Sequence, residues 1–287
     1  MTSRRNFVKK AGAGLLAMSV SSVFLNEELY AAAPEKKTKK EDLFKVGIAG
    51  FSFRHFTLDQ TLEMMQRVGV NYLCIKDFHL PYNATKAECD AFHAKLKSKG
   101  IIGYAVGPIN LASMKNEQMI DDAFEYAKRA GVKLIVGVPG IEHLPYVDKK
   151  VKEYDFKFAI HNHGPKDQRY PNAKAIWELV KNLDPRIGMC LDIGHNIRTG
   201  ADPTDDLKKY QKRVFDIHLK DVTAAAAEGT DIEMGRGVID FPAFVKMLRK
   251  VKFDGVCSLE YEKDMNDPLA GIAESIGNFK GVMAASV

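Results

Sequence analysis

From residue 44 onward, short runs of apolar and β-branched residues alternate with longer amphipathic stretches. Short apolar runs bounded by turn residues are typical of buried strands, and apolar residues at helical spacing are typical of helices that pack on one face. The predicted strands are Val46–Phe51, Tyr72–Lys76, Ile101–Val106, Lys133–Val138, Lys157–His161, Ile187–Asp192, Val214–Leu219 and Val256–Tyr261. The predicted helices are Thr57–Val68, Lys86–Lys99, Glu117–Ala130, Ala173–Asn182, Thr204–Lys212, Phe241–Val251 and Pro268–Lys280, with a less regular helical pattern over Ile141–Tyr154.

This alternation predicts an α/β protein with a single (β/α)8 TIM barrel over residues 44–287. The length agrees, because such a barrel usually takes ~250 residues. A doubly wound parallel sheet is the alternative. That fold usually carries a Gly-rich phosphate loop after its first strand, and the segment Gly50-Phe51-Ser52-Phe53-Arg54 has no GxGxxG pattern.

Residues 1–33 are predicted to be an export signal that precedes the barrel. Ser3-Arg4-Arg5-Asn6-Phe7 leads into an apolar stretch over 11–25, and Ala31-Ala32-Ala33 supplies a small-residue cleavage region. The paired arginines resemble the twin-arginine type, with an ordinary secretory signal as the alternative. Residues 34–43 are predicted to be a linker. We expect an exported, periplasmic protein without a membrane span after signal removal, since no later stretch is apolar over the ~20 residues that a span requires.

Composition and charge point to a small-molecule partner. The chain is 46% hydrophobic and 28% charged, which is ordinary for a globular protein. The first 33 residues carry two more basic than acidic side chains, so without them the net charge falls from +5 to +3. So small a surplus argues against nucleic-acid binding. The sequence has no Cys-x-x-Cys pair. The four cysteines are expected to be thiols in the core: Cys74, Cys89, Cys190 and Cys257.

Polar residues gather where five of the predicted strands end, and the carboxyl ends of the strands carry the chemistry of TIM barrels. Alternate residues of a strand share a face, so three same-face pairs are expected. These pairs are His161 with His163, His218 with Lys220, and Glu260 with Glu262.

Four consecutive strands then offer imidazole, carboxylate, imidazole and carboxylate, a donor set that suits a divalent transition metal. The predicted ligands are His161, Asp192, His218 and Glu260. His163 is an alternative to His161. A single strand histidine is more often a hydrogen-bonded core residue, and a strand-end carboxylate often caps the next helix. Four such residues on neighbouring strands favour the metal site.

Further candidates surround the predicted metal. The catalytic base is expected among Glu260, Glu262 and His163. His195 is a candidate donor to a substrate oxygen, and Lys220 a candidate to stabilise an oxyanion. The predicted substrate-binding residues are Lys76, His79, Glu142 and Arg236, the last in a long loop after the seventh strand.

The strand-end segments resemble those of the xylose isomerase-like TIM-barrel superfamily of sugar isomerases and epimerases. The matching segments are His161-Asn162-His163-Gly164, Leu191-Asp192-Ile193-Gly194-His195, His218-Leu219-Lys220-Asp221, Gly235-Arg236-Gly237 and Leu259-Glu260-Tyr261-Glu262. The resemblance implies one divalent metal, which is Mn, Co, Zn, Fe, Ni or Mg, and a carbohydrate substrate. Ketose 3-epimerases of this superfamily use Glu, Asp, His and Glu as ligands. Asp192, His218 and Glu260 match that pattern and His161 departs from it, while the His-x-His-Gly segment is similar to that of inosose dehydratase.

The resemblance predicts an isomerase or epimerase that acts on a sugar or keto-sugar through an enediolate. A hydro-lyase that uses the same first step is the first alternative, and an inactive sugar-binding barrel is the second. The endonuclease IV branch shares the fold but needs a multi-metal cluster and a DNA-binding surface, against which the small net charge argues. A homodimer is left open as the oligomeric state.

Overall fold

The computed structural model describes residues 41–111 and 117–286. The predicted export signal over 1–33 lies outside the described residues, as does most of the predicted linker over 34–43. The chain divides into a unit of residues 1–41 and a unit of Asp42–Val287, and the barrel belongs to the second. The Asp42 carboxylate accepts hydrogen bonds from Arg249 Nε at 2.6 Å and Nη2 at 2.9 Å, which ties the start of this unit to its last third.

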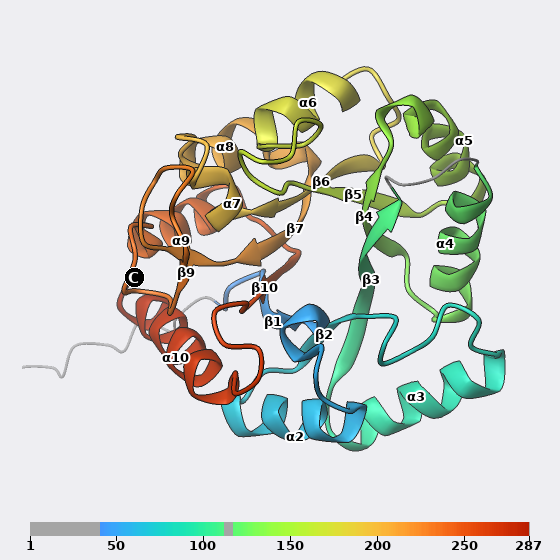
Figure 1. The fold of residues 1–287 in the computed structure, drawn as a ribbon, viewed down its shortest axis with the longest axis horizontal. Coiled ribbons are helices and arrows are strands. Elements are labelled where there is room, and N and C mark those ends of the chain that lie inside the picture. The colour runs from blue at the N-terminus through green and yellow to red at the C-terminus, as the bar shows by residue number, and fades with distance from the viewer. Residues whose placement is uncertain (1–40, 112–116, 287) are drawn as a thin grey trace, which may run out of the picture. The chain divides into compact units, whose positions relative to one another are not determined.

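Eight parallel strands close into a barrel, and this confirms the predicted fold (Figure 1). Around the barrel the strands run β1, β2, β3, β4, β5, β6, β7 and β10, with β10 paired to β1. Their bounds are β1 Lys45–Ala49, β2 Tyr72–Ile75, β3 Ile102–Leu111, β4 Leu134–Pro139, β5 Lys157–His161, β6 Ile187–Asp192, β7 Val214–Leu219 and β10 Val256–Leu259. A short hairpin of β8 (Asp221–Val222) and β9 (Asp231–Ile232) follows β7.

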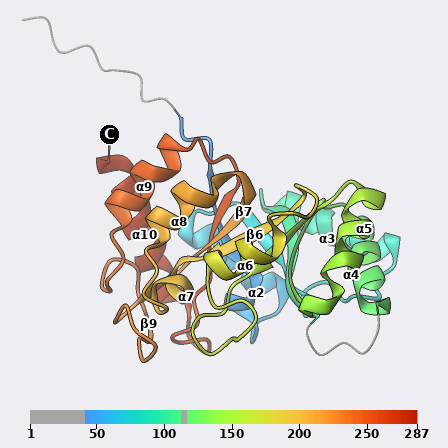
Figure 2. The ribbon, with the colours of Figure 1, turned by 90° about the horizontal axis from the view of Figure 1, so that it is seen from above.

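Helices surround the barrel, with α8, α9 and α10 grouped on one side of it and α3, α4 and α5 on another (Figure 2). Their bounds are η1 Gly50–Phe53, α2 Leu58–Val68, α3 Lys86–Ser98, α4 Gln118–Arg129, η2 Ile141–His143, α5 Leu144–Tyr154, α6 Ala173–Val180, α7 Ile193–Ile197, α8 Pro203–Tyr210, η3 Gln211–Arg213, α9 Phe241–Lys250 and α10 Leu269–Ala285. Thr57 and Thr85 begin α2 and α3 with capping boxes, which satisfy amide groups that a helix start leaves free. The irregular pattern over 141–154 forms a helix.

Strand β3 differs most from its prediction. The apolar pattern predicts an end at Val106, whereas the strand continues to Leu111 with a register shift against β4 between Val106 and Ile109. Gly107 and Pro108 cause the underprediction, because proline lacks the amide hydrogen that a regular ladder uses. The extra length carries Asn110 to the mouth of the barrel.

The core has two layers. Large apolar residues such as Phe124, Phe158 and Phe244 pack between the helices and the strands. Small residues fill the barrel interior: Cys74, Ala105, Val136, Ala159 and Cys190. All four cysteines are free and buried, as expected. Within the described ranges, no helix is both long and apolar enough to cross a membrane.

Candidate metal centre and active site

Four neighbouring strand ends bring two imidazoles and two carboxylates into one buried cluster. It consists of His161 from β5, Asp192 from β6, His218 from β7 and Glu260 just after β10, and one ligand atom of each lies within 4.8 Å of the others. His161 Nε2 lies 3.0 Å from His218 Nδ1, 3.5 Å from Glu260 Oε2 and 3.7 Å from Asp192 Oδ2. His218 Nδ1 lies 3.3 Å from Glu260 Oε2. We call these four residues the donor cluster.

The donor cluster fits a divalent transition metal. Two ring nitrogens, His161 Nε2 and His218 Nδ1, face each other, so at most one of them carries the hydrogen and the other offers a lone pair. Asp192 Oδ2 is buried and accepts no hydrogen bond of good geometry among the described residues, although the Lys220 ammonium lies 3.3 Å away. Such unsatisfied buried atoms call for an explanation, and a mixed imidazole and carboxylate set is one that transition metals bind.

Asp192 serves two purposes with its two oxygens. Oδ1 accepts a hydrogen bond from the backbone amide of His195 at 2.7 Å and so caps α7. Oδ2 faces His161 instead. The Asn162 side chain donates to the carbonyl of Asp192 and accepts from its amide, both at 2.9 Å, which joins the ends of β5 and β6. Asp192 therefore caps α7 with one oxygen and contributes the other oxygen to the donor cluster.

Lys220 lies behind the carboxylates and does not line the cavity. Its ammonium is 3.3 Å from Asp192 Oδ2 and 3.3 Å from Glu260 Oε2, and it also pairs with Glu262. Burial disfavours the charge, but these carboxylates outweigh it and hold the pKa of Lys220 well above its ordinary value. Gly194 allows this packing, because a Cβ there would lie 2.7 Å from Lys220 Cγ. In the structure Lys220 contacts three carboxylates, and its contact with a substrate oxyanion stays a prediction.

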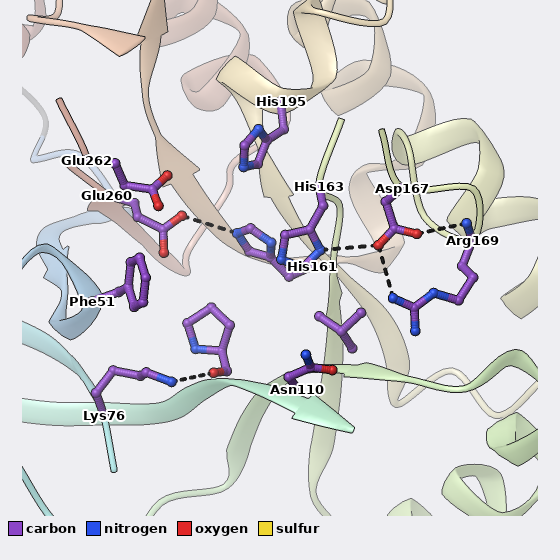
Figure 3. Close-up of a pocket in the computed structure, with 12 residues that line it drawn as sticks. Phe51, Lys76, Asn110, His161, His163, Asp167, Arg169, His195, Glu260 and Glu262 are labelled. Carbon is purple, nitrogen blue, oxygen red and sulfur yellow. Dashed lines mark hydrogen bonds and ion pairs between the residues drawn. The ribbon is translucent and has the colours of Figure 1, made fainter. Parts of the chain in front are cut away.

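A cavity of about 430 Å³ opens in front of the donor cluster. Its lining residues are Phe51, Lys76, Pro108, Asn110, Val138, His161, His163, Asp167, Arg169, His195, Glu260 and Glu262. Figure 3 shows the two glutamates on one side and the pair of His163 and Asp167 on the other, with Phe51 and Lys76 on the wall below. This size is within the range of small-molecule sites.

The titratable groups on the two sides of the cavity differ in charge. Burial, helped by the neighbouring His161, lowers the pKa of His163 to about 4. Burial likewise lowers the pKa of His195 to about 3. Burial disfavours the charge of Glu260 as well, but His218 and Lys220 beside it hold its pKa well below the ordinary value. At neutral pH the imidazoles of His163 and His195 are therefore neutral, and the carboxylate of Glu260 is ionised.

Three predicted substrate-binding residues stand outside the cavity, so their placement is corrected. His79 is buried, with Nε2 at 3.1 Å from both Thr61 Oγ1 and the carbonyl of Phe56, and it ties the loop after β2 to α2. The Glu142 side chain is 70% exposed beside His143. Arg236 donates to both carboxylate oxygens of Glu274 on α10. A position after a strand brought each residue to the correct end of the barrel, but each points to another partner.

Several lining residues escaped the sequence analysis. Asp167 accepts from the backbone amides of Arg169 and Tyr170 at 2.8 and 3.3 Å, and its Oδ2 lies 3.6 Å from His163 Nδ1. An Asp two residues before an Arg in the Gly-containing loop after His163 was an available signal. For Phe51, the sequence offered no signal beyond its position at the end of the first predicted strand.

A model of the xylose isomerase-like TIM barrel family matches residues 60–281 of the chain. The rhizopine catabolism protein MocC of Rhizobium meliloti is 26% identical over 133 residues, covering 41% of this chain and 40% of MocC. The inosose dehydratase of Lacticaseibacillus casei is 23% identical over 202 residues, covering 64% of this chain and 65% of that enzyme. The chain thus spans less than two thirds of either relative.

Solved structures share the fold over most of the chain. A protein of Parabacteroides distasonis superposes with a TM-score of 0.65 at 28% identity, covering 83% of this chain and 98% of that one. The IolI protein with a bound zinc atom gives 0.67 at 19% identity, covering 85% and 98%. The D-psicose 3-epimerase of Clostridium cellulolyticum H10 gives 0.64 at 15% identity, covering 84% and 99%. At these identities the last two show the fold alone.

Proposed function

Because the chain belongs to the xylose isomerase-like TIM barrel family, we propose that it is a metal-dependent lyase that dehydrates a keto-sugar or keto-polyol. The first step removes the proton from the carbon next to the carbonyl, and the second expels the hydroxyl from the carbon beyond it. The similarity to inosose dehydratase supports this reaction class. The single observation that carries the proposal is the donor cluster with an imidazole at its β5 position.

His161, Asp192, His218 and Glu260 would hold the ion. When bound, a divalent ion supplies a Lewis acid for the carbonyl oxygen, which acidifies the adjacent C–H bond. Lys220 keeps the carboxylates of Asp192 and Glu260 charged and in place, because its ammonium lies 3.3 Å from each. The chain therefore provides a buried binding site for the divalent ion.

His163 is assigned the removal of the proton. Its Nδ1 faces Asp167 Oδ2 at 3.6 Å, so the carboxylate favours the tautomer with hydrogen on Nδ1 and leaves the Nε2 lone pair free. Arg169, whose Nη2 lies 3.3 Å from the same oxygen, holds Asp167. This is the geometry of a base oriented by a carboxylate. Glu262, on the other side of the cavity, is assigned the proton transfer to the departing hydroxyl: burial raises its pKa, which favours the protonated acid, and after the transfer its carboxylate pairs with Lys220.

Epimerisation is the second candidate, since Asp192, His218 and Glu260 match three ligand positions of ketose 3-epimerases. A two-carboxylate epimerisation needs acidic groups on both faces of the substrate. Here the β5 position holds His161, and the carboxylate across the cavity from Glu260 and Glu262 is Asp167, which is already bound by the backbone amides of Arg169 and Tyr170 (Figure 3). The arrangement therefore favours elimination over inversion.

The test incubates the metal-loaded protein with a keto-inositol and with keto-sugars in D₂O and follows the products by mass spectrometry and NMR. Loss of water with a new conjugated carbonyl supports the lyase. A stereoisomer that carries deuterium, without loss of water, supports the epimerase and overturns the dehydration. Binding without either change supports the sugar-binding barrel. Arg236→Ala is the matched control, because Arg236 contacts Glu274 and not the cavity.

A further inference from the structure

The two nitrogens of His218 face different surroundings. Nδ1 faces the donor cluster, 3.3 Å from Glu260 Oε2. Nε2 points one layer deeper into the barrel, where Asp216 Oδ2 lies 3.7 Å away. Asp216 and His218 are alternate residues of β7 and so share its inner face. Both side chains are fully buried.

The contacts of the Asp216 carboxylate, among the described residues, are neutral apart from His218. Tyr104 from β3 donates its hydroxyl to both oxygens at 3.0 Å, and Cys190 Sγ donates to Oδ2 at 3.6 Å. Tyr104 is held in turn by Ser258 Oγ at 2.5 Å. The nearby thiol of Cys74 donates to the carbonyl of Gly107 at 3.4 Å. Both thiols also interact with His218, but thiol sulfur is a weak acceptor, so the carboxylate of Asp216 is the strongest acceptor near an Nε2 hydrogen.

A buried carboxylate is costly when neutral donors alone balance it. A divalent ion bound on the other side of the His218 ring would lower this cost, because its positive charge polarises the imidazole and strengthens the attraction between the ring N–H and the carboxylate. Carboxylates behind metal-binding histidines fix the ring tautomer and raise the basicity of the ligating nitrogen.

We infer that Asp216 is a positioning residue for the metal. It keeps the hydrogen of His218 on Nε2, so that the Nδ1 lone pair is directed at the donor cluster, and Tyr104 and Ser258 hold it there across the barrel. The inference rests on the metal of the proposed function. It adds a network below the site that joins β3, β7 and β10 to one metal ligand.

The test compares Asp216→Asn with the wild type in metal-free form, by titration with Co²⁺ and Zn²⁺. We expect metal affinity to fall about 10- to 100-fold, the usual effect of removing such a partner. The visible absorption of bound Co²⁺ should shift, because the donor strength of His218 changes. The melting temperature of the metal-free variant should stay level or rise, since a buried charge is removed. A merely structural Asp216 predicts the reverse: a lower melting temperature with unchanged affinity and spectrum.

Tyr104→Phe keeps the inference testable if Asp216→Asn does not fold. This variant retains the Asp216 carboxylate but removes the hydroxyl that donates to both of its oxygens, so we expect a smaller loss of metal affinity. The matched control is Asp184→Asn, which removes a carboxylate that pairs with Arg186 away from the cavity. Metal affinity that equals the wild type in the variants overturns this inference alone. A wild type that binds no metal overturns the inference and the proposed function together.

Discussion

The two halves of the barrel end in different chemistry. Strands β5, β6, β7 and β10 end in the buried donor cluster, in which every side chain contacts another charged or ring group. Strands β1 to β4 deliver Phe51, Lys76, Asn110 and Val138, a mixed wall without a carboxylate. In the proposed function, the half with the donor cluster would hold the metal, and we call it the metal half; the other would set the shape available to the substrate, and we call it the substrate half.

The strand ends of the two halves are also held by different backbone features. In the metal half, Asn162 joins β5 to β6 by two hydrogen bonds at the height of the donor cluster. In the other half, a 3-10 turn that contains Phe51 follows β1, and β3 shifts register against β4 between Val106 and Ile109; β6 also shifts register against β7, between Met189 and Cys190. The Asn162 hydrogen bonds fix the spacing between the ends of β5 and β6, which supply two residues of the donor cluster.

The largest expected effect comes from Asp192→Asn in the metal half. Asparagine still caps α7 through its side-chain oxygen, so the fold should persist, but the charged donor at Oδ2 is lost. We expect loss of bound metal and activity reduced to background, measured by elemental analysis and product formation. Asp240→Asn is the matched control, because Asp240 caps α9 in the same way through the amide of Ala243. A variant with unchanged metal content and activity would contradict the donor assignment.

A smaller effect is expected from His163→Asn, which removes the assigned base and leaves the donor cluster intact. The rate should fall about 10²- to 10⁴-fold, the usual contribution of general acid–base catalysis, with metal content unchanged. Asp167→Asn should lower the rate less, because the imidazole remains and only its orientation is lost. Steady-state kinetics with parallel metal analysis measure both. If His163→Asn retains the full rate, Glu260 or Glu262 becomes the base.

In the substrate half, Phe51→Ala should act on binding. Fully burying a large apolar side chain contributes about 1.5–3 kcal/mol, so losing part of that contact with the substrate should raise KM roughly two- to tenfold with a smaller change in kcat. Metal affinity should not change, since Phe51 offers no ligand atom, although it lies next to Glu260 (Figure 3). Loss of metal in this variant would contradict the claim that metal binding and substrate binding depend on different halves of the barrel.

The smallest effect concerns stability away from both halves. The Arg186 guanidinium beside Asp184 lowers the pKa of that carboxyl to about 2, below the ~3.9 of an unfolded chain. This pairing therefore adds stability above about pH 4, and the stability is lost as the pH falls toward 2. Asp184→Asn should flatten the decline in melting temperature over that interval and leave activity at neutral pH unchanged. An identical decline in both proteins would show that Asp184 does not contribute.

The sequence was sufficient for the barrel and for the donor cluster because both depend on local order. The alternation of runs predicts eight strands, and the last residues of four neighbouring strands must meet at one rim. Export, cleavage of the signal and dimer formation stay predictions.

Contacts across the barrel could not be predicted in the same way. Tyr104 and Asp216 lie 112 positions apart, and neither strand alone indicates that they meet. For the same reason Lys220, predicted to face substrate, turned out to be enclosed by carboxylates from two other strands. His79 and Arg236 show that a position at the correct rim does not determine which neighbour a side chain contacts.

Elemental analysis of the wild type, Asp192→Asn and His218→Ala, purified without added metal and again after reconstitution, tests the central claim most directly. The account predicts close to one divalent transition metal per chain in the wild type and none in either variant. A wild type without metal after reconstitution, or variants that keep the full amount, would contradict it.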